Sequence, residues 1–207
     1  MSDFLFALLV FAALFNPAGG ALVWRSVRRI AADPSDLDQG DPDNSVGATT
    51  RSYPEVLPGV ALAVVLLAIA ALLGDGVIDL LDTSPSSFAV ASGLLLILWA
   101  ARLILQRRPF ALDPSPPSAW LPALRMAGWL ATPAALAIAA YHGADIGVGR
   151  TILAVAVAAA GVGVASALTE RVASRTHLLA LREAGRLVAA VLVVLAVVLI
   201  VDGVQTV

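Results

Sequence analysis

Two short motifs centred on proline contain the residues of this chain best suited by type and spacing to bind a solute. Asn16-Pro17-Ala18-Gly19-Gly20 interrupts the first apolar segment, and Thr132-Pro133-Ala134-Ala135 interrupts the fourth. Proline has no N–H group, and its ring clashes with the carbonyl four residues back, so each motif predicts a break in an apolar helix. We expect the breaks to free the carbonyls of Ala13 and Trp129.

The chemistry expected at such breaks is the binding of a zwitterion. Beyond each proline a new half-helix should begin, and its first N–H groups have no acceptor within the helix. These groups, near Ala18 to Gly20 and near Ala134 to Leu136, form the positive end of a helix dipole, which attracts a carboxylate. The freed carbonyls can accept an ammonium group or a cation, so the two sets of groups together suit an amino acid.

Other residues near the breaks add to this hypothesis. Asn16 and Thr132 occupy N-cap positions, where either side chain can cap its half-helix or contact the substrate. Gly19 and Gly20 let backbone or ligand approach closely. Arg125 is the only charge well inside a predicted span, which makes it a functional candidate, although its side chain can also snorkel to the interface. The predicted substrate-binding residues are Ala13, Asn16, Pro17, Ala18, Gly19, Gly20, Arg125, Trp129, Thr132, Pro133, Ala134 and Ala135.

A plain proline kink is the alternative interpretation of each motif, because proline is tolerated in membrane helices. One kink alone would favour that interpretation. Two kinks at matching places in the two halves of the chain favour a substrate site, since many membrane carriers build their sites from paired broken helices.

The composition is that of a membrane protein. Of the 207 residues, 59% are hydrophobic and 14% are charged, whereas soluble domains are roughly 45–50% apolar and about 25% charged. The net charge of −2 and the lack of a basic patch argue against nucleic acid as a partner. Because the chain has no cysteine, two histidines and no carboxylate pair near a midplane, we expect no enzyme activity, metal site or cofactor.

Six stretches are apolar enough to cross a bilayer, which takes about 20 residues as a helix. They are roughly Phe4–Trp24, Val56–Leu73, Pro85–Ile104, Ser118–Tyr141, Thr151–Leu168 and Arg186–Val201. This pattern predicts an all-α, multi-pass fold with a first repeat at 1–108, a proline-rich linker at 109–117 and a second repeat at 118–207. Gly161, Gly163 and Ala165 in the fifth stretch predict close helix packing.

The two halves are expected to form an inverted repeat, because three spans per half make the second half enter from the opposite side. Residues 14–18 (LFNPA) align with residues 130–134 (LATPA). At ~1.5 Å per residue, Pro17 and Pro133 fall near or just beyond the midplane. Helices one and four are therefore predicted to be broken within the membrane.

Arginine placement predicts the orientation. The loops after spans one, three and five carry the arginines, whereas the opposite side has only Arg150. The positive-inside rule places both termini outside the cytoplasm. The acidic, proline-bearing segment at about 33–52 is then a disordered cytoplasmic loop.

The chain resembles the MarC family of six-span membrane proteins, which includes neutral amino-acid transporters of the SnatA type. The resemblance rests on Asn16-Pro17-Ala18-Gly19, on Gly74 through Leu96, and on the pairs Arg186-Leu187 and Asp202-Gly203. It implies alternating-access transport of small neutral amino acids such as glycine or alanine, coupled to H⁺ or Na⁺, in a bacterial inner membrane. A homo-oligomer is left open.

The chain departs from the family pattern at four positions. Leu22 replaces a second proline, Ala89 replaces an arginine, and Thr132 and Ala134 replace glycines around the proline of span four. Two other functions compete with the carrier. An aquaporin-like channel also has Asn-Pro-Ala motifs and six spans, but there the motif lies on a half-helix between spans two and three. A non-transporting membrane subunit is the other alternative.

Overall fold

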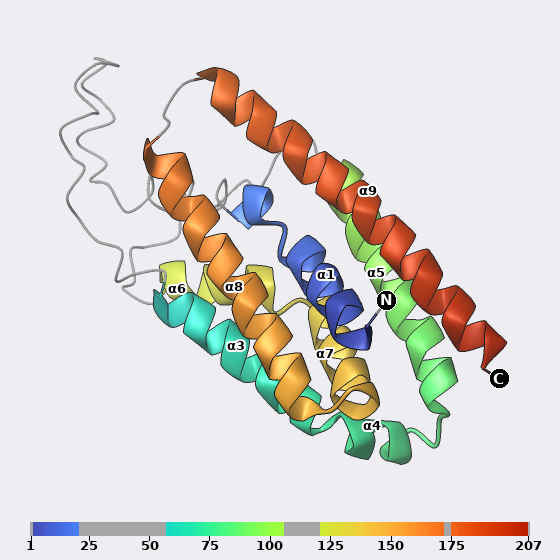
Figure 1. Ribbon diagram of the computed structural model, residues 1–207. Helices are drawn as coiled ribbons and strands as arrows, with labels where there is room; N and C mark the ends of the chain where they lie inside the picture. Colours follow the sequence, from blue (N-terminus) through green and yellow to red (C-terminus); the bar gives the residue numbers. More distant parts are fainter. Residues whose placement is uncertain (1, 21–56, 106–120, 172–174, 207) are drawn as a thin grey trace.

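The computed structural model describes residues 2–20, 57–105, 121–171 and 175–206, and their regular structure is α-helical throughout (Figure 1). The helices are α1 (Asp3–Phe15), α3 (Leu57–Leu72), α4 (Gly74–Leu80), α5 (Pro85–Leu105), α6 (Leu121–Leu130), α7 (Pro133–Asp145), α8 (Val148–Arg171) and α9 (Arg175–Gln205). The all-α prediction is therefore confirmed over these residues. The acidic segment, the proline-rich linker and Leu22 lie outside them.

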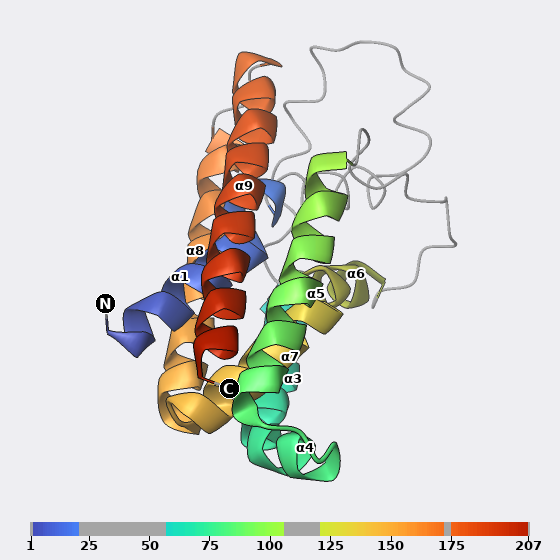
Figure 2. The ribbon, with the colours of Figure 1, turned by 90° about the vertical axis from the view of Figure 1, so that its right-hand side faces the viewer.

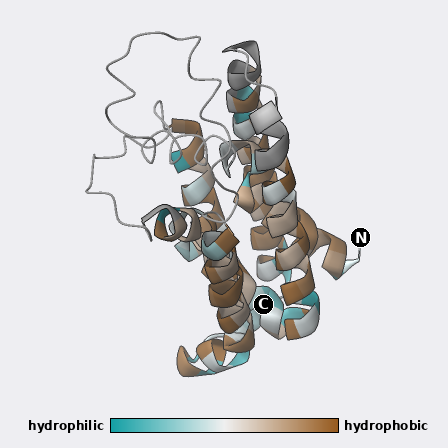
Figure 3. Cartoon of the chain, turned by 90° about the vertical axis from the view of Figure 1, so that its left-hand side faces the viewer, coloured by the Kyte–Doolittle hydropathy of each residue, from teal (hydrophilic) through white to brown (hydrophobic). Residues whose placement is uncertain are grey.

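The helices have the lengths and compositions of a multi-pass membrane protein. Asp3–Gly20, Pro85–Leu105, Val148–Ala165 and Glu183–Gln205 are each long and apolar enough to cross a bilayer. Two bent pairs, α3 with α4 and α6 with α7, raise the number to six if each pair is one span. Apolar residues cover the outer faces of the helices (Figure 3), and many large ones are exposed there, among them Leu94, Leu98, Val194 and Val198.

The breaks at both proline motifs are confirmed. The first helix stops at Phe15 and resumes at Pro17, with Asn16 between them in the left-handed region at φ 43°. The fourth stretch breaks between Leu130 and Pro133, and the helices on either side of that break are bent by 56°.

A third break, between Leu72 and Gly74, was not predicted. It bends α3 against α4 by 53°. No proline stands there. Gly74 instead presses against the backbone of Ala140, and Gly143 presses against the backbone of Ala71. This reciprocal close packing of α3 and α4 against α7 depends on tertiary contact, which a local motif does not show.

The helices pack in a pattern that joins the two halves of the chain. The most extensive contact is between α5 and α9, which run side by side (Figure 2). Gly93 and Gly203 make this approach possible, since a Cβ on Gly93 would lie 2.5 Å from Cγ1 of Ile200 and one on Gly203 would lie 2.7 Å from the carbonyl oxygen of Ser86. Other extensive contacts join α3 to α6 and α7, and α1 to α8.

The prediction of close packing at Gly161 and Gly163 is wrong. Both residues are exposed, and a Cβ on either would meet nothing within 4 Å. Helical periodicity explains the result, because α8 packs through the face that carries Ala154, Ala158 and Val162, all buried. The two glycines are two positions apart, which places them on either side of this face, and both are exposed.

Several carboxylates lie at one end of the bundle. Asp3 at the start of α1, Asp145 at the end of α7 and Asp202 near the end of α9 interact electrostatically. The end of the molecule that holds these carboxylates is called the acidic end below. It also includes α4, with Asp75 and Asp79, which lies at the bottom of Figure 1.

Candidate functional site

Asn16 caps the half-helix that follows it. The Asn16 side-chain Oδ1 accepts a hydrogen bond from the Gly19 backbone N–H at 3.0 Å. The Asn16 carbonyl accepts one from the Gly20 N–H at 2.8 Å. Asparagine tolerates the left-handed conformation that this turn requires better than most residues do. The side chain is buried, with 3% of the residue exposed.

Thr132 does the same for α7. Its Oγ1 accepts a hydrogen bond from the Ala135 N–H at 3.1 Å, and its carbonyl accepts one from the Leu136 N–H at 2.9 Å. Thr132 is also 3% exposed. Both residues therefore act as N-caps, as their positions predict, and in each case proline occupies the first position of the helix, where its missing N–H removes no bond.

The same cap occurs at a third position. Ser84 precedes Pro85 at the start of α5, and its Oγ accepts a hydrogen bond from the Ser87 N–H at 3.1 Å. Ser84 is exposed. A capping residue followed by proline is thus an ordinary way to begin a helix in this protein, and burial is what distinguishes Asn16 and Thr132.

Two expectations about free backbone groups need correction. The Ala13 carbonyl is not free, because it accepts a hydrogen bond from the Asn16 N–H at 3.2 Å. The amides of Gly19, Gly20, Ala135 and Leu136 are already bound to the capping residues. The left-handed turn at Asn16 and the two caps supply partners that proline chemistry alone does not reveal. Within the described residues, Ala18 and Ala134 keep the unbonded amides at these helix starts.

Trp129 brings the two breaks together. A Cβ on Gly19 would lie 3.1 Å from Cζ2 of Trp129, and one on Gly20 would lie 3.8 Å from its Nε1. Trp129 stands three residues before Thr132, so the last turn of α6 covers the glycines after the first break. Trp129 was included in the predicted site for its carbonyl, and it is the indole ring that makes this contact.

Two residues beside the site were not predicted. The Trp99 ring of α5 lies 5.8 Å from the Trp129 ring, centroid to centroid, and the Arg102 guanidinium lies 5.3 Å over Trp99. Gly185 of α9 accepts a hydrogen bond from Nδ2 of Asn16 at 3.3 Å. Neither Trp99 nor Gly185 is marked by a local motif, because each is brought to the break by helices distant in sequence.

The remaining predicted residues occupy different environments. Pro17 and Ala18 are half-buried and Pro133 is exposed, so the ring of Pro133 shapes the break without lining the interior. Ala134 and Ala135 are buried. Arg125 is half-buried on α6, one turn before Trp129.

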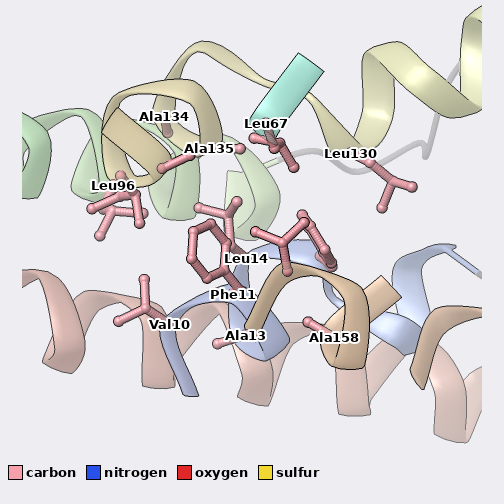
Figure 4. Close-up of a cluster of buried hydrophobic side chains, with 14 of the residues drawn as sticks. Val10, Phe11, Ala13, Leu14, Leu67, Leu96, Leu130, Ala134, Ala135 and Ala158 are labelled. Carbon is pink, nitrogen blue, oxygen red and sulfur yellow. The ribbon is translucent and has the colours of Figure 1, made fainter. Parts of the chain in front are cut away.

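Apolar side chains fill the space between the breaks. Phe11 and Leu14 of α1 face Leu130 of α6 and the alanines at the start of α7 (Figure 4). All of these residues belong to one buried core. These buried side chains leave the space between the breaks closed, so they must move apart before a solute can lie between α1 and α6 or α7.

Scans against family models and searches of curated proteins and solved structures found no match for the chain. Over the described residues, no group of three or more His, Asp or Glu side chains is placed to hold a metal ion. The candidate site consists of backbone amides, two capping side chains and two indole rings.

Proposed function

We propose that this protein is a carrier of small neutral amino acids, with glycine and alanine as the first candidates. The observation that carries the proposal is the contact between the breaks. Gly19, after the first break, packs against Trp129, which precedes the second, and both capping residues are buried. Alternating access would work by separating and closing these two broken helices.

The packing of the two halves supports an inverted repeat. In such a repeat α1 corresponds to α6 with α7, α3 with α4 corresponds to α8, and α5 corresponds to α9. If the two halves are equivalent, a contact between α1 and α8 requires an equivalent contact between α7 and α3. A contact between α5 and α7 likewise requires one between α9 and α1. All four contacts are present. The contact between α7 and α8 has no counterpart of similar extent between α1 and α3.

The substrate class is inferred from the backbone amides that the caps leave unbonded and from the indole rings beside them. The amides of Ala18 and Ala134 lie at the positive ends of two half-helices, where a carboxylate is stabilised. The Arg102 guanidinium lies 5.3 Å over the Trp99 ring, which shows that an aromatic face beside the breaks attracts a cation, as it would a substrate ammonium group. The tight packing around Gly19 and Gly20 requires a small side chain. The resemblance to the MarC family points to the same class of substrate, with H⁺ or Na⁺ as the coupling ion.

Transport by reconstituted protein tests the proposal. Liposomes would be loaded with the purified chain, and uptake of radiolabelled glycine and alanine would be measured with imposed proton or sodium gradients. We expect saturable uptake that excess unlabelled substrate blocks. Uptake that rises linearly with concentration would favour a channel. No uptake from a monodisperse sample under any gradient would favour a non-transporting subunit.

A further inference from the structure

His142 is a buried ionisable group that the proposed site does not use. It lies on α7 ten residues after Thr132, or ~15 Å along the helix at 1.5 Å per residue. It is 1% exposed, and neither ring nitrogen has a hydrogen-bond partner within the described residues. Buried polar groups in proteins are nearly always hydrogen-bonded, so an imidazole without a partner calls for an explanation.

Aromatic rings surround His142 and connect it to the first break. Its ring centroid lies 6.0 Å from that of Phe6, 6.2 Å from that of Phe11 and 5.1 Å from that of Tyr141. Phe11 in turn lies 6.1 Å from Phe15, the residue before Asn16. The imidazole is therefore held between α1 and its own helix. The aromatic contacts extend from it through Phe11 to Phe15, next to the Asn16 cap.

We propose that His142 is the proton-binding group through which this carrier is coupled to a proton gradient. The inference rests on the proposed function. Separation of α1 from α7 would admit water from the acidic end, and a proton from that water would bind Nδ1 or Nε2. Closure would return the ring to its apolar shell, where a charged imidazolium is costly without a carboxylate partner. The protonation state and the closure of α1 on α7 are then linked.

Few charged groups act on this ring. Asp3 of α1 interacts with it electrostatically. Tyr141 and Asp145 flank it on α7, and Asp202 of α9 acts on both of these neighbours. Among the side chains that the structure describes on elements packed against α7, the other charged ones are exposed: Asp75 and Asp79 on α4, Arg150 on α8 and Arg102 on α5. Asp3 is thus the carboxylate that acts directly on the ring, and it lies on the helix that must move.

Two transport assays distinguish coupling to protons from transport of the amino acid itself. Counterflow of labelled glycine or alanine at equal pH needs only the carrier, whereas accumulation driven by a pH gradient needs the proton site. We expect His142→Gln to keep counterflow and to lose gradient-driven accumulation. His177→Gln, at the chain's only other histidine, should behave as wild type. Normal proton-driven accumulation by His142→Gln, or wild-type accumulation driven by sodium alone, would overturn the coupling role. Absence of wild-type counterflow would overturn the proposed function and the coupling role with it.

A second measurement does not depend on the folding of His142→Gln. In His177→Gln the imidazole of His142 is the only one in the chain, so NMR of ¹³C-labelled histidine reports on it directly. We expect its titration to shift when saturating glycine or alanine is added. An imidazole signal that does not respond to pH or to either amino acid would overturn the inference.

Discussion

Nδ2 of Asn16 donates a hydrogen bond to the carbonyl of Gly185 at 3.3 Å, across 169 positions of sequence. The same side chain uses its Oδ1 to cap the half-helix after the break. One amide therefore fixes the first broken helix internally and ties it to α9. Any movement of the half-helix against α9 must break this bond, which makes Asn16 the most informative residue to change.

Replacing Asn16 separates its backbone role from its side-chain role. Asn16→Ala removes the cap, which lowers the free energy of unfolding by about 1 kcal/mol. It also forces alanine into the left-handed region, which lowers that free energy by about 1–2 kcal/mol more. Asn16→Gly accepts that conformation and costs only about a few tenths of a kcal/mol. We expect thermal unfolding in detergent to show a large loss for the alanine variant and a small one for glycine. Equal losses would mean that the backbone conformation at Asn16 contributes little.

The contact between Gly19 and Trp129 should be essential for transport. A Cβ on Gly19 would lie 3.0 Å from Nδ2 of Asn16 and 3.1 Å from Cζ2 of Trp129. Overpacking of this kind typically costs about 1–3 kcal/mol of stability. Because the extra methyl group would also obstruct the movement of one break against the other, we expect Gly19→Ala to lower the rate of glycine uptake about tenfold or more. Gly161→Ala is the matched control, because its Cβ would meet open space. Similar uptake by the two variants would remove Gly19 from the site.

The cap at Thr132 should matter because it is buried. Thr132→Val keeps the shape of the side chain but leaves the Ala135 N–H without its acceptor, at a cost of about 1 kcal/mol, whereas Thr132→Ser keeps the hydroxyl. Ser84→Ala removes the equivalent cap at an exposed helix start, where water can replace it. We expect uptake and melting temperature to fall for Thr132→Val and to change little for the other two variants. Unchanged uptake and melting temperature for Thr132→Val would contradict a role for the second break in transport.

The sequence predicted the features that depend on local chemistry. Both proline breaks and both caps could be predicted, because the missing N–H of proline and the acceptor on Asn16 or Thr132 act within one turn of helix. The free Ala13 carbonyl was a wrong inference from the same local rule. The rule for an unbroken helix does not include the left-handed turn, which directs the Asn16 N–H back to that carbonyl.

Features that depend on neighbouring helices could not be predicted. The bend between α3 and α4 arises where Gly74 meets the backbone of Ala140. The prediction of close helix packing at Gly161 was based on its small size alone. Close approach instead occurs at Gly93 and Gly203, as at Gly74 and Gly143, because these glycines face another helix and Gly161 does not. The contacts of Gly185 with the first break likewise require the full arrangement.

The bend between α3 and α4 gives a prediction about stability. A Cβ on Gly74 would collide with the Ala140 carbonyl, and the backbone on both sides leaves little room to relax. We expect Gly74→Ala to lower stability by about 1–3 kcal/mol, measured as thermal unfolding in detergent. Gly76→Ala lies two residues away on the same helix, where a Cβ would meet nothing within 4 Å. It should be neutral or stabilising by up to about 1 kcal/mol, and a destabilised Gly76→Ala would show that the contact is not the cause.

Single-cysteine labelling tests the orientation, because the chain has no native cysteine. The acidic end holds the start of α1, the whole of α4 and the end of α9, and arginine placement predicts that this end faces away from the cytoplasm. We expect Gly76→Cys and Gln205→Cys to react with a membrane-impermeant maleimide in intact cells. Glu183→Cys, exposed at the other end of α9, should react only after the membrane is permeabilised. Protection of Gly76→Cys together with labelling of Glu183→Cys in intact cells would reverse the assignment. The pH gradient that drives His142 would then act from the cytoplasmic side.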